Sequence, residues 1–117
     1  MSINMSSRAI NFTVKVGARS TLQLTIKNAD GTSKNLTNDT TYSTGKWKVW
    51  KPDGTLVING TIVFTTRATG IVSYTLVAAD TVIANAGIWE GEVELKDTSG
   101  VISEQTQSFN FTIEESY

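Results

Sequence analysis

The chain has 117 residues, of which 39% are hydrophobic and 18% charged, a composition typical of one folded domain rather than a disordered segment. It contains neither cysteine nor histidine, which excludes disulfides, thiol nucleophiles and the commonest general base and zinc ligand. The formal net charge is −1, but residues 1–67 hold nine Lys/Arg against three Asp, whereas residues 68–117 hold one Lys against eight Asp/Glu. This uneven distribution of charge has two possible explanations. Strands from the two parts of the chain pair and neutralise each other, or copies of a molecule with one basic and one acidic part stack head to tail.

Residues 1–8 are predicted to form a flexible N-terminal arm, followed by a single domain over residues 9–117. The first residues contain no apolar segment of the kind found in secretory signals, and no apolar run is long enough to span a membrane. Beyond the arm, apolar and polar residues alternate with the period of two that is typical of half-buried strands. Seven strands are predicted, over residues 10–16, 22–26, 47–49, 62–64, 72–76, 89–95 and 109–113.

The segments between these strands are rich in residues that favour turns. Turns are predicted at residues 28–31, 52–54, 59–60 and 97–100, each of which contains Asn or Asp ahead of Gly. The stretch 32–45 is predicted to be mostly loop, with Leu36 as the candidate anchor of a short extra strand. Residues 79–87 are the one helical candidate, a single turn that Asp80 would cap and Gly87 would end.

Short strands that each have one apolar face predict an all-β fold. Two antiparallel sheets packed as an immunoglobulin-like sandwich of about seven strands, with at most one helical turn, would bury all of these faces. Trp47 lies on a central predicted strand, and its burial would remove about 200 Å² from water. At about 25 cal/mol per Å² this is worth roughly 5 kcal/mol as an upper estimate. Trp47 is therefore predicted to be a main core residue.

Three carboxylates share one face of the predicted strand 89–95, because side chains two apart on a strand point the same way. They are Glu90, Glu92 and Glu94. Such a cluster is compatible with a metal site or an acid/base pair. We favour a structural role, in which the acids form a solvated outer face opposite Lys46 and Lys48 of a neighbouring strand. This pairing predicts the register of the two strands, and no catalytic, cofactor-binding or metal-binding residue is assigned.

Residues 46–51, KWKVWK, alternate bases with aromatic and apolar residues, a composition also found in strands that stack nucleic-acid bases. The net charge and the facing acidic strand favour a central sandwich strand with its lysines outside, so no nucleic-acid partner is predicted. Trp50 is an even number of residues from Lys46 and Lys48, so its side chain should point outward with theirs. It would then face a partner or lie beneath the 32–45 loop. Trp50, Lys46 and Lys48 are the predicted partner-contact residues.

The order of these parts resembles the N-terminal domain of the phage baseplate upper protein family. In that family a strand ending in Lys-Pro-Asp-Gly precedes a strand with the pattern Gly-x-hydrophobic-x-Tyr-x-Leu. A short turn that closes in Gly before an aromatic residue follows, then a Glu-x-Glu-Leu strand and a last strand with Phe-x-Phe/Ile. The matching segments are residues 51–54, 70–76, 86–89, 92–95 and 109–113, and the match covers roughly residues 20–114.

The resemblance implies an immunoglobulin-like sandwich in a tailed-phage virion, a structural and non-enzymatic module that attaches receptor-binding parts to the tail or baseplate. The expected partners are other virion proteins, with multiple copies in a symmetric assembly. No cofactor and no membrane partner are predicted, and synthesis would take place in the host cytoplasm. Family members continue into a helical stalk and further domains, whereas this sequence ends at Tyr117. Capsid decoration, head-fibre attachment, and carbohydrate or cell-surface binding through Trp50 therefore stay open as alternatives.

Overall fold

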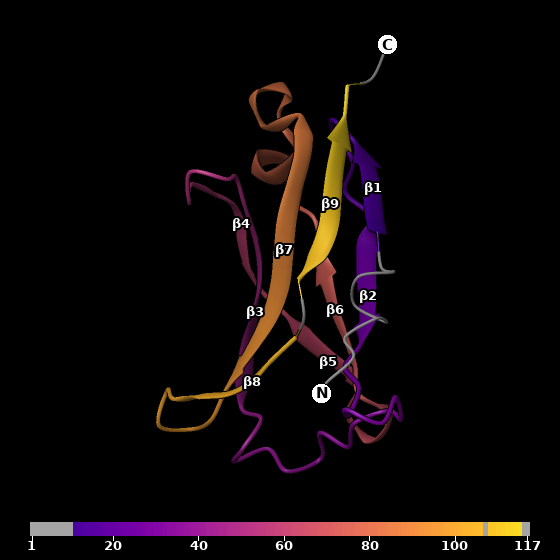
Figure 1. Ribbon diagram of the computed structural model, residues 1–117, viewed down its shortest axis with the longest axis vertical. Helices are drawn as coiled ribbons and strands as arrows, with labels where there is room; N and C mark the ends of the chain where they lie inside the picture. The colour runs from indigo at the N-terminus through magenta and orange to yellow at the C-terminus, as the bar shows by residue number, and fades with distance from the viewer. Residues whose placement is uncertain (1–10, 107, 116–117) are drawn as a thin grey trace.

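The computed structural model describes residues 11–106 and 108–115, where every regular element is a β-strand or a 3-10 turn (Figure 1). The strands are β1 (Asn11–Lys15), β2 (Thr21–Thr25), β3 (Thr44–Trp50), β4 (Leu56–Thr61), β5 (Val63–Thr66), β6 (Ile71–Thr75), β7 (Gly87–Lys96), β8 (Ile102–Gln105) and β9 (Phe109–Glu114). The 3-10 turns are η1 (Arg67–Thr69), η2 (Ala78–Thr81) and η3 (Ile83–Asn85). No helix in this part of the chain is long and apolar enough to cross a membrane.

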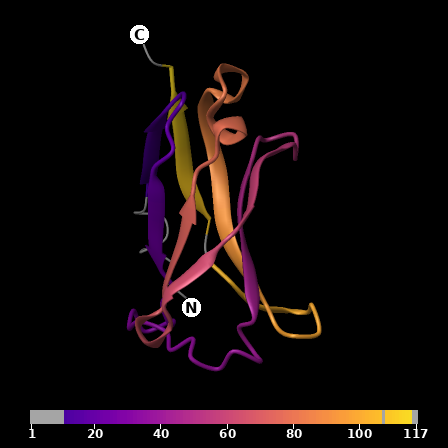
Figure 2. The ribbon, with the colours of Figure 1, turned by 180° about the vertical axis from the view of Figure 1, so that it is seen from behind.

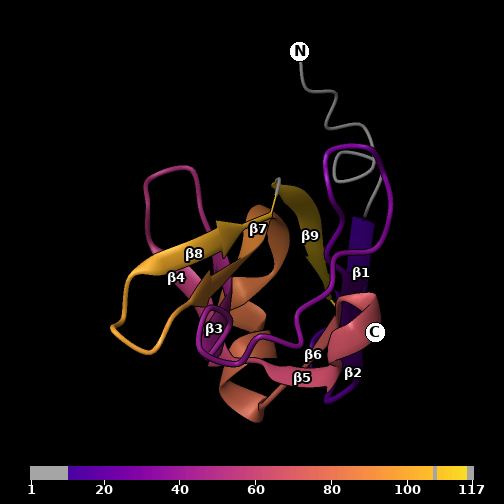
Figure 3. The ribbon, with the colours of Figure 1, turned by 90° about the horizontal axis from the view of Figure 1, so that it is seen from below.

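The strands form two sheets. The six-stranded sheet has the order β1-β9-β7-β3-β4, with β8 also paired to β7, and the three-stranded sheet has the order β2-β6-β5. β9 pairs with the first half of β7 and β8 with its last residues, so both occupy the same edge of β7. Seen from below, β5, β6 and β2 lie opposite β7, β8 and β9 (Figure 3). The predicted all-β sandwich is confirmed.

The number and pairing of the strands differ from the prediction. The described residues contain nine strands rather than seven, and β1 runs parallel to β9, so the sandwich is not wholly antiparallel. β8 was outside the predicted set because its sequence, ISEQ, lacks apolar alternation. Asn59-Gly60, predicted to form a turn, lies inside β4. A Cβ on Gly60 would lie 2.0 Å from the ring of Tyr74 in the opposite sheet, so this glycine serves close packing rather than a turn.

The predicted helical turn over 79–87 is instead two consecutive 3-10 turns, η2 and η3, and η1 is a third turn that the sequence did not predict. Asp80 stabilises this segment from inside η2, where its carboxylate accepts a hydrogen bond from the Val77 N–H at 2.9 Å. Gly87 begins β7 rather than ending a helix. Its φ is 148°, and a Cβ there would lie 2.4 Å from the Trp89 ring. The predicted arm, residues 1–8, lies outside the described residues.

The loop that joins β2 to β3 is held against the sandwich although it forms no strand around Leu36. The Leu36 side chain is fully buried, and its N–H donates to the carbonyl of Arg67 at 2.8 Å. In return, the Arg67 guanidinium donates to the carbonyls of Leu36 and Tyr42, at 3.1 and 2.8 Å. The same guanidinium lies 3.9 Å from the centre of the Phe64 ring. Leu36 is thus a core anchor of an ordered loop.

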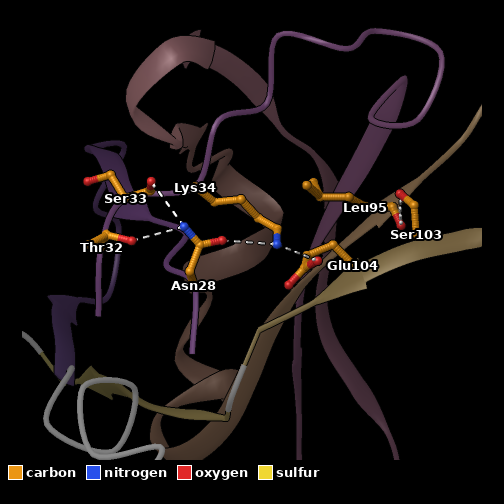
Figure 4. A network of polar contacts seen from close by, with 7 residues as sticks. All are labelled: Asn28, Thr32, Ser33, Lys34, Leu95, Ser103 and Glu104. Carbon is orange, nitrogen blue, oxygen red and sulfur yellow. Dashed lines mark hydrogen bonds and ion pairs between the residues drawn. The ribbon is translucent and has the colours of Figure 1, made fainter. Parts of the chain in front are cut away.

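A second set of contacts ties this loop to the six-stranded sheet (Figure 4). The Lys34 ammonium lies between Asn28 Oδ1, at 3.3 Å, and Glu104 Oε1 of β8, at 3.4 Å. Asn28 in turn donates to the Thr32 hydroxyl and to the Ser33 carbonyl. The lower end of the molecule in Figure 1, where this loop and the β7–β8 turn lie, is therefore cross-linked by polar contacts.

Trp47 lies at the centre of the core and is fully buried, as the sequence predicts. Its ring centre is 6.3 Å from that of Tyr74 on β6, 5.2 Å from Phe109 and 5.1 Å from Phe12, so it bridges the two sheets. Its indole N–H has no acceptor among the described residues. The remaining buried apolar residues are Val14, Leu22, Leu24, Ile26, Leu36, Val49, Ile58, Ile62, Val72, Leu76, Val93, Leu95, Phe111 and Ile113.

Candidate interaction face

Strands β3 and β7 lie side by side at the centre of the six-stranded sheet. Lys46 lies opposite Glu94, Lys48 opposite Glu92, and Trp50 opposite Glu90. The lysine row of β3 therefore faces the glutamate row of β7, as the sequence predicts. We call the solvent side of this sheet the outer face. The alternate residues of both strands point inward, among them the fully buried Trp47, Val49, Val93 and Leu95.

In the lower part of the β3–β7 pair, the charged groups satisfy one another. The Lys48 ammonium is 3.2 Å from Glu94 Oε1, diagonally across the strands. The Gln105 amide of β8 donates to Glu92 Oε2 at 2.9 Å and to Glu94 Oε2 at 3.3 Å. Lys46 donates to the Thr61 hydroxyl of β4 at 3.0 Å. Both lysines of the predicted contact set therefore already have partners within the domain.

Glu94 is buried and Glu92 partly buried, which corrects the expectation of a wholly solvated acidic face. The Glu94 side chain is only 8% exposed, because Lys48 and the neighbouring strand β8 with Gln105 lie against it. The pKa of Glu92 is raised, first by burial and then by the charge of Glu94, while the hydrogen bond from Gln105 and the charge of Lys48 oppose this rise. The acids thus form a hydrogen-bonded network that fixes register.

Three ion pairs show how the uneven charge of the sequence is used. Each joins a lysine of residues 1–67 to a glutamate of residues 68–117. They are Lys15–Glu114 at 3.6 Å, Lys34–Glu104 at 3.4 Å and Lys48–Glu94 at 3.2 Å. The pairing favours neutralisation inside the domain over head-to-tail stacking through opposite charges.

The upper part of the same pair of strands differs in its contacts. Trp50 points outward with the lysines and is partly exposed. It lies at the opposite end of β3 from the 32–45 loop, so the loop does not cover it. Leu56 lies opposite Trp50 on β4, after a β-bulge, and is 49% exposed. Glu90 is exposed, and its carboxylate makes no hydrogen bond or ion pair with the described residues. Trp50 is therefore the predicted contact residue that stays available.

An apolar turn over residues 77–88 adjoins this region; the sequence predicted a helical turn here but not its exposed apolar surface. Its four large side chains, Val77, Val82, Ile83 and Ile88, are 52%, 43%, 65% and 71% exposed. The signal that could have identified it is the absence of charge, since Asp80 is the only charged residue between 76 and 89. Figure 2 shows its two 3-10 turns projecting at the upper end of the molecule.

Buried polar groups hold the apolar turn in place from beneath. The Asp80 carboxylate is buried and accepts a hydrogen bond from the Tyr74 hydroxyl at 2.6 Å. Burial, followed by this hydrogen bond to a carboxylate, raises the pKa of Tyr74 well above its usual value. The Asn85 amide donates to the Asp80 carbonyl at 3.2 Å, and the Trp89 indole donates to the Asn85 carbonyl at 2.8 Å. Polar atoms therefore face inward here while aliphatic side chains face solvent.

The described residues contain no group of three or more His, Cys, Asp or Glu side chains placed to hold a metal ion. A shallow hollow of about 500 Å³ is lined by Lys15, Ala86, Gly87, Ile113, Glu114 and Glu115. Lys15, the lysine among these lining residues, forms an exposed ion pair with Glu114.

Comparison with known proteins identifies the family. The BppU N-terminal domain family matches residues 2–117. The chain belongs to this family. BppU N-terminal domains are structural domains of the phage baseplate, so this BppU domain is a structural component of a phage virion. It therefore associates with other virion proteins. The family is structural and is not known to be enzymatic.

The fold is also found in a solved structure of a phage protein domain. The N-terminal domain of phage TP901-1 ORF48 superposes with a TM-score of 0.67 at 13% sequence identity, covering 88% of this chain and 83% of that chain. CopC from Methylosinus trichosporium OB3b gives a TM-score of 0.49 at 12% identity, covering 91% and 87% of the two chains. No curated protein matches the sequence.

Proposed function

We propose that this BppU domain is a docking or adaptor module of the phage tail or baseplate, present in multiple copies and acting through protein–protein contacts. The observation that carries the proposal is the apolar turn over residues 77–88. Four of the eight exposed large hydrophobic side chains of the described residues lie on it. A concentrated, uncharged apolar surface on a small polar domain is typical of a protein contact site.

The rigidity of the apolar turn supports docking further. Tyr74, Asn85 and Trp89 hold it through hydrogen bonds to Asp80 and the turn backbone. A partner would therefore meet a surface that is already ordered, and association would lose less conformational entropy than with a loose loop. The internal pairing of Lys15, Lys34 and Lys48 supports contact with a different protein rather than electrostatic stacking of copies.

The test uses phage particles that carry Ile83→Asp, with Val101→Asp as the matched control. Both side chains are similarly exposed, 65% and 61%, but Val101 lies at the lower end of the molecule. Quantitative mass spectrometry of separated tails and heads should find the wild-type chain on tails, in a copy number that fits the local symmetry. We expect Ile83→Asp to lower incorporation about tenfold or more, because a charge would be buried without a partner. Val101→Asp should be incorporated normally.

Two outcomes would overturn this proposal. If the wild-type chain is absent from purified tails, the domain is not a tail or baseplate module, and its presence on heads alone would indicate capsid decoration or head-fibre attachment. If Ile83→Asp and Val101→Asp are incorporated equally well, the apolar turn is not the contact that holds the domain on the particle.

A further inference from the structure

We propose that Trp50, Leu56, Ile88 and Glu90 form a docking patch that receives an arginine, flanked by apolar side chains, from a second virion protein. The inference rests on the proposed docking function and adds the chemistry of the partner. The four residues lie on adjacent strands, β4, β3 and β7, at the upper end of the outer face. We call these four residues the docking patch.

The strand register brings the docking patch together. Leu56, Trp50 and Glu90 lie in one row across three strands, and the row continues to Asn110 of β9. Ile88 precedes Glu90 by two residues, so it points to the same side of the sheet. Ile88 is 71% exposed and also belongs to the apolar turn. The docking patch is therefore continuous with the surface that supports the proposed function.

Glu90 differs from the other two glutamates of β7 in having no partner among the described residues. Glu92 and Glu94 share Gln105, and Glu94 also pairs with Lys48. The lysine that follows Trp50, Lys51, places its ammonium 5.3 Å from the centre of the Trp89 ring instead. The charge of Glu90 is therefore left to solvent, beside the exposed Ile88 and the partly exposed Trp50, with Leu56 on the far side of Trp50.

This arrangement determines what kind of surface can cover the docking patch. A partner that packs on Leu56, Trp50 and Ile88 must also cover Glu90, which lies next to both Trp50 and Ile88. Burying a carboxylate without a counter-charge is strongly unfavourable, so a purely apolar partner surface does not fit. An arginine fits best, because its planar guanidinium can stack on the Trp50 ring and donate two hydrogen bonds to the Glu90 carboxylate.

A second copy of the chain, bound through the same patch in a two-fold contact, would not compensate the charge of Glu90. A two-fold contact would place the same surface on both sides, and the patch contains no cation. It would bring a second Glu90 near the first, with like charges and no compensation. A different protein that supplies the cation is therefore the occupant that the charges favour.

The experiment measures the affinity of the purified domain for the other tail and baseplate proteins of the same phage. Each of these proteins is produced separately, and binding is measured by calorimetry at low and at moderate salt concentration. The test variants are Glu90→Gln, Glu90→Lys and Trp50→Ala. Asp39→Asn and Asp39→Lys are the matched controls, because Asp39 is an exposed carboxylate in the loop at the lower end. Thermal unfolding of every variant confirms that it is folded.

We expect one virion protein to bind the wild type and both Asp39 variants alike. Glu90→Lys should weaken this binding at least about tenfold, and Trp50→Ala by a similar factor, with a smaller loss for Glu90→Gln. Added salt should weaken wild-type binding more than Glu90→Gln binding. Replacing the contacting arginine of the partner by glutamate should restore binding to Glu90→Lys.

Results other than those expected distinguish failure of the docking-patch inference from failure of the proposed function. If a virion protein binds all docking-patch variants as tightly as the wild type, the patch assignment is wrong while the docking function stands. If no virion protein binds and the chain is missing from tails, the proposed function itself fails. Self-association that depends on Glu90 would make a second copy the occupant, and glycan-array binding that Trp50→Ala abolishes would make it a carbohydrate. Either result overturns the inference.

Discussion

The two ends of the β3–β7 pair have the same backbone pairing and the same inside–outside alternation, yet their outer side chains behave differently. At the lower end, Lys48 and Gln105 bind the carboxylates of Glu92 and Glu94, and the network is partly buried. At the upper end, Trp50 and Glu90 face each other across the strands without an internal partner for the carboxylate. Side chains that satisfy one another stabilise the fold, whereas side chains left unsatisfied on a rigid frame are available for recognition.

The largest expected effect contrasts the two tryptophans of β3. Trp47→Ala should lower the free energy of unfolding by about 3–5 kcal/mol, because it leaves a cavity where the ring meets Tyr74 and Phe109. Trp50→Ala should lower it by about 1 kcal/mol or less, since this side chain is partly exposed on the outer face. Urea denaturation measures both. Similar losses for the two variants would contradict the division between a structural and a recognition tryptophan.

An intermediate effect is expected from Lys48→Met, which removes the charge and keeps the aliphatic part of the side chain. The buried Glu94 then loses its only ion-pair partner among the described residues. We expect a loss of about 1–3 kcal/mol. Glu90→Gln, at the other end of the same strands, should change stability by less than about 0.5 kcal/mol. Thermal unfolding of both variants sharpens the comparison, and an equal or larger effect of Glu90→Gln would reverse it.

The smallest effect is a pH dependence that arises at Glu92. Its pKa is raised in the folded state, chiefly by burial and next by Glu94, so the folded protein holds this proton more tightly than the unfolded chain does. Stability therefore falls as pH rises from the ordinary Glu pKa, about 4.3, through the raised value. Glu92→Gln removes this penalty and should raise the melting temperature slightly at pH 7. The gain should disappear near pH 4, and a gain at pH 4 as large as at pH 7 would contradict this origin.

The inside–outside alternation along the strands predicted the core correctly, and it predicted that the lysines of β3 face the glutamates of β7. Trp47, Val93 and Leu95 alternate with charged residues and are buried. A shift of two residues would also set lysines opposite glutamates, so the exact pairing, Lys46 with Glu94 and Lys48 with Glu92, comes from the structure. The family resemblance was confirmed as well. Local alternation therefore carries most of the information that specifies this sandwich.

Features that depend on contacts distant in sequence escaped the prediction. Asn59-Gly60 has the sequence of a hairpin turn. The Tyr74 ring of the other sheet occupies the space beside Gly60, so packing between the sheets, and not the turn preference, determines where this pair lies. The burial of Glu94 follows from β8, whose four residues carry no strand pattern of their own. The apolar turn was predicted as one helical turn because Asp80 and Gly87 resemble helix signals. In the structure Asp80 is buried beneath the turn, which leaves the aliphatic side chains on the surface.

The parallel pairing of β1 with β9 has a consequence for synthesis on the ribosome. Asn11 and Asn110, which share a hydrogen bond, are 99 residues apart in the chain. At typical elongation rates the ribosome needs about 5–20 s to make that length, and during this time β1 has no neighbour in its sheet. β9 must then enter between β1 and β7, because it pairs with both. β9, the last strand of the described residues, is an interior strand, so closure of the six-stranded sheet is a late step governed by long-range contacts.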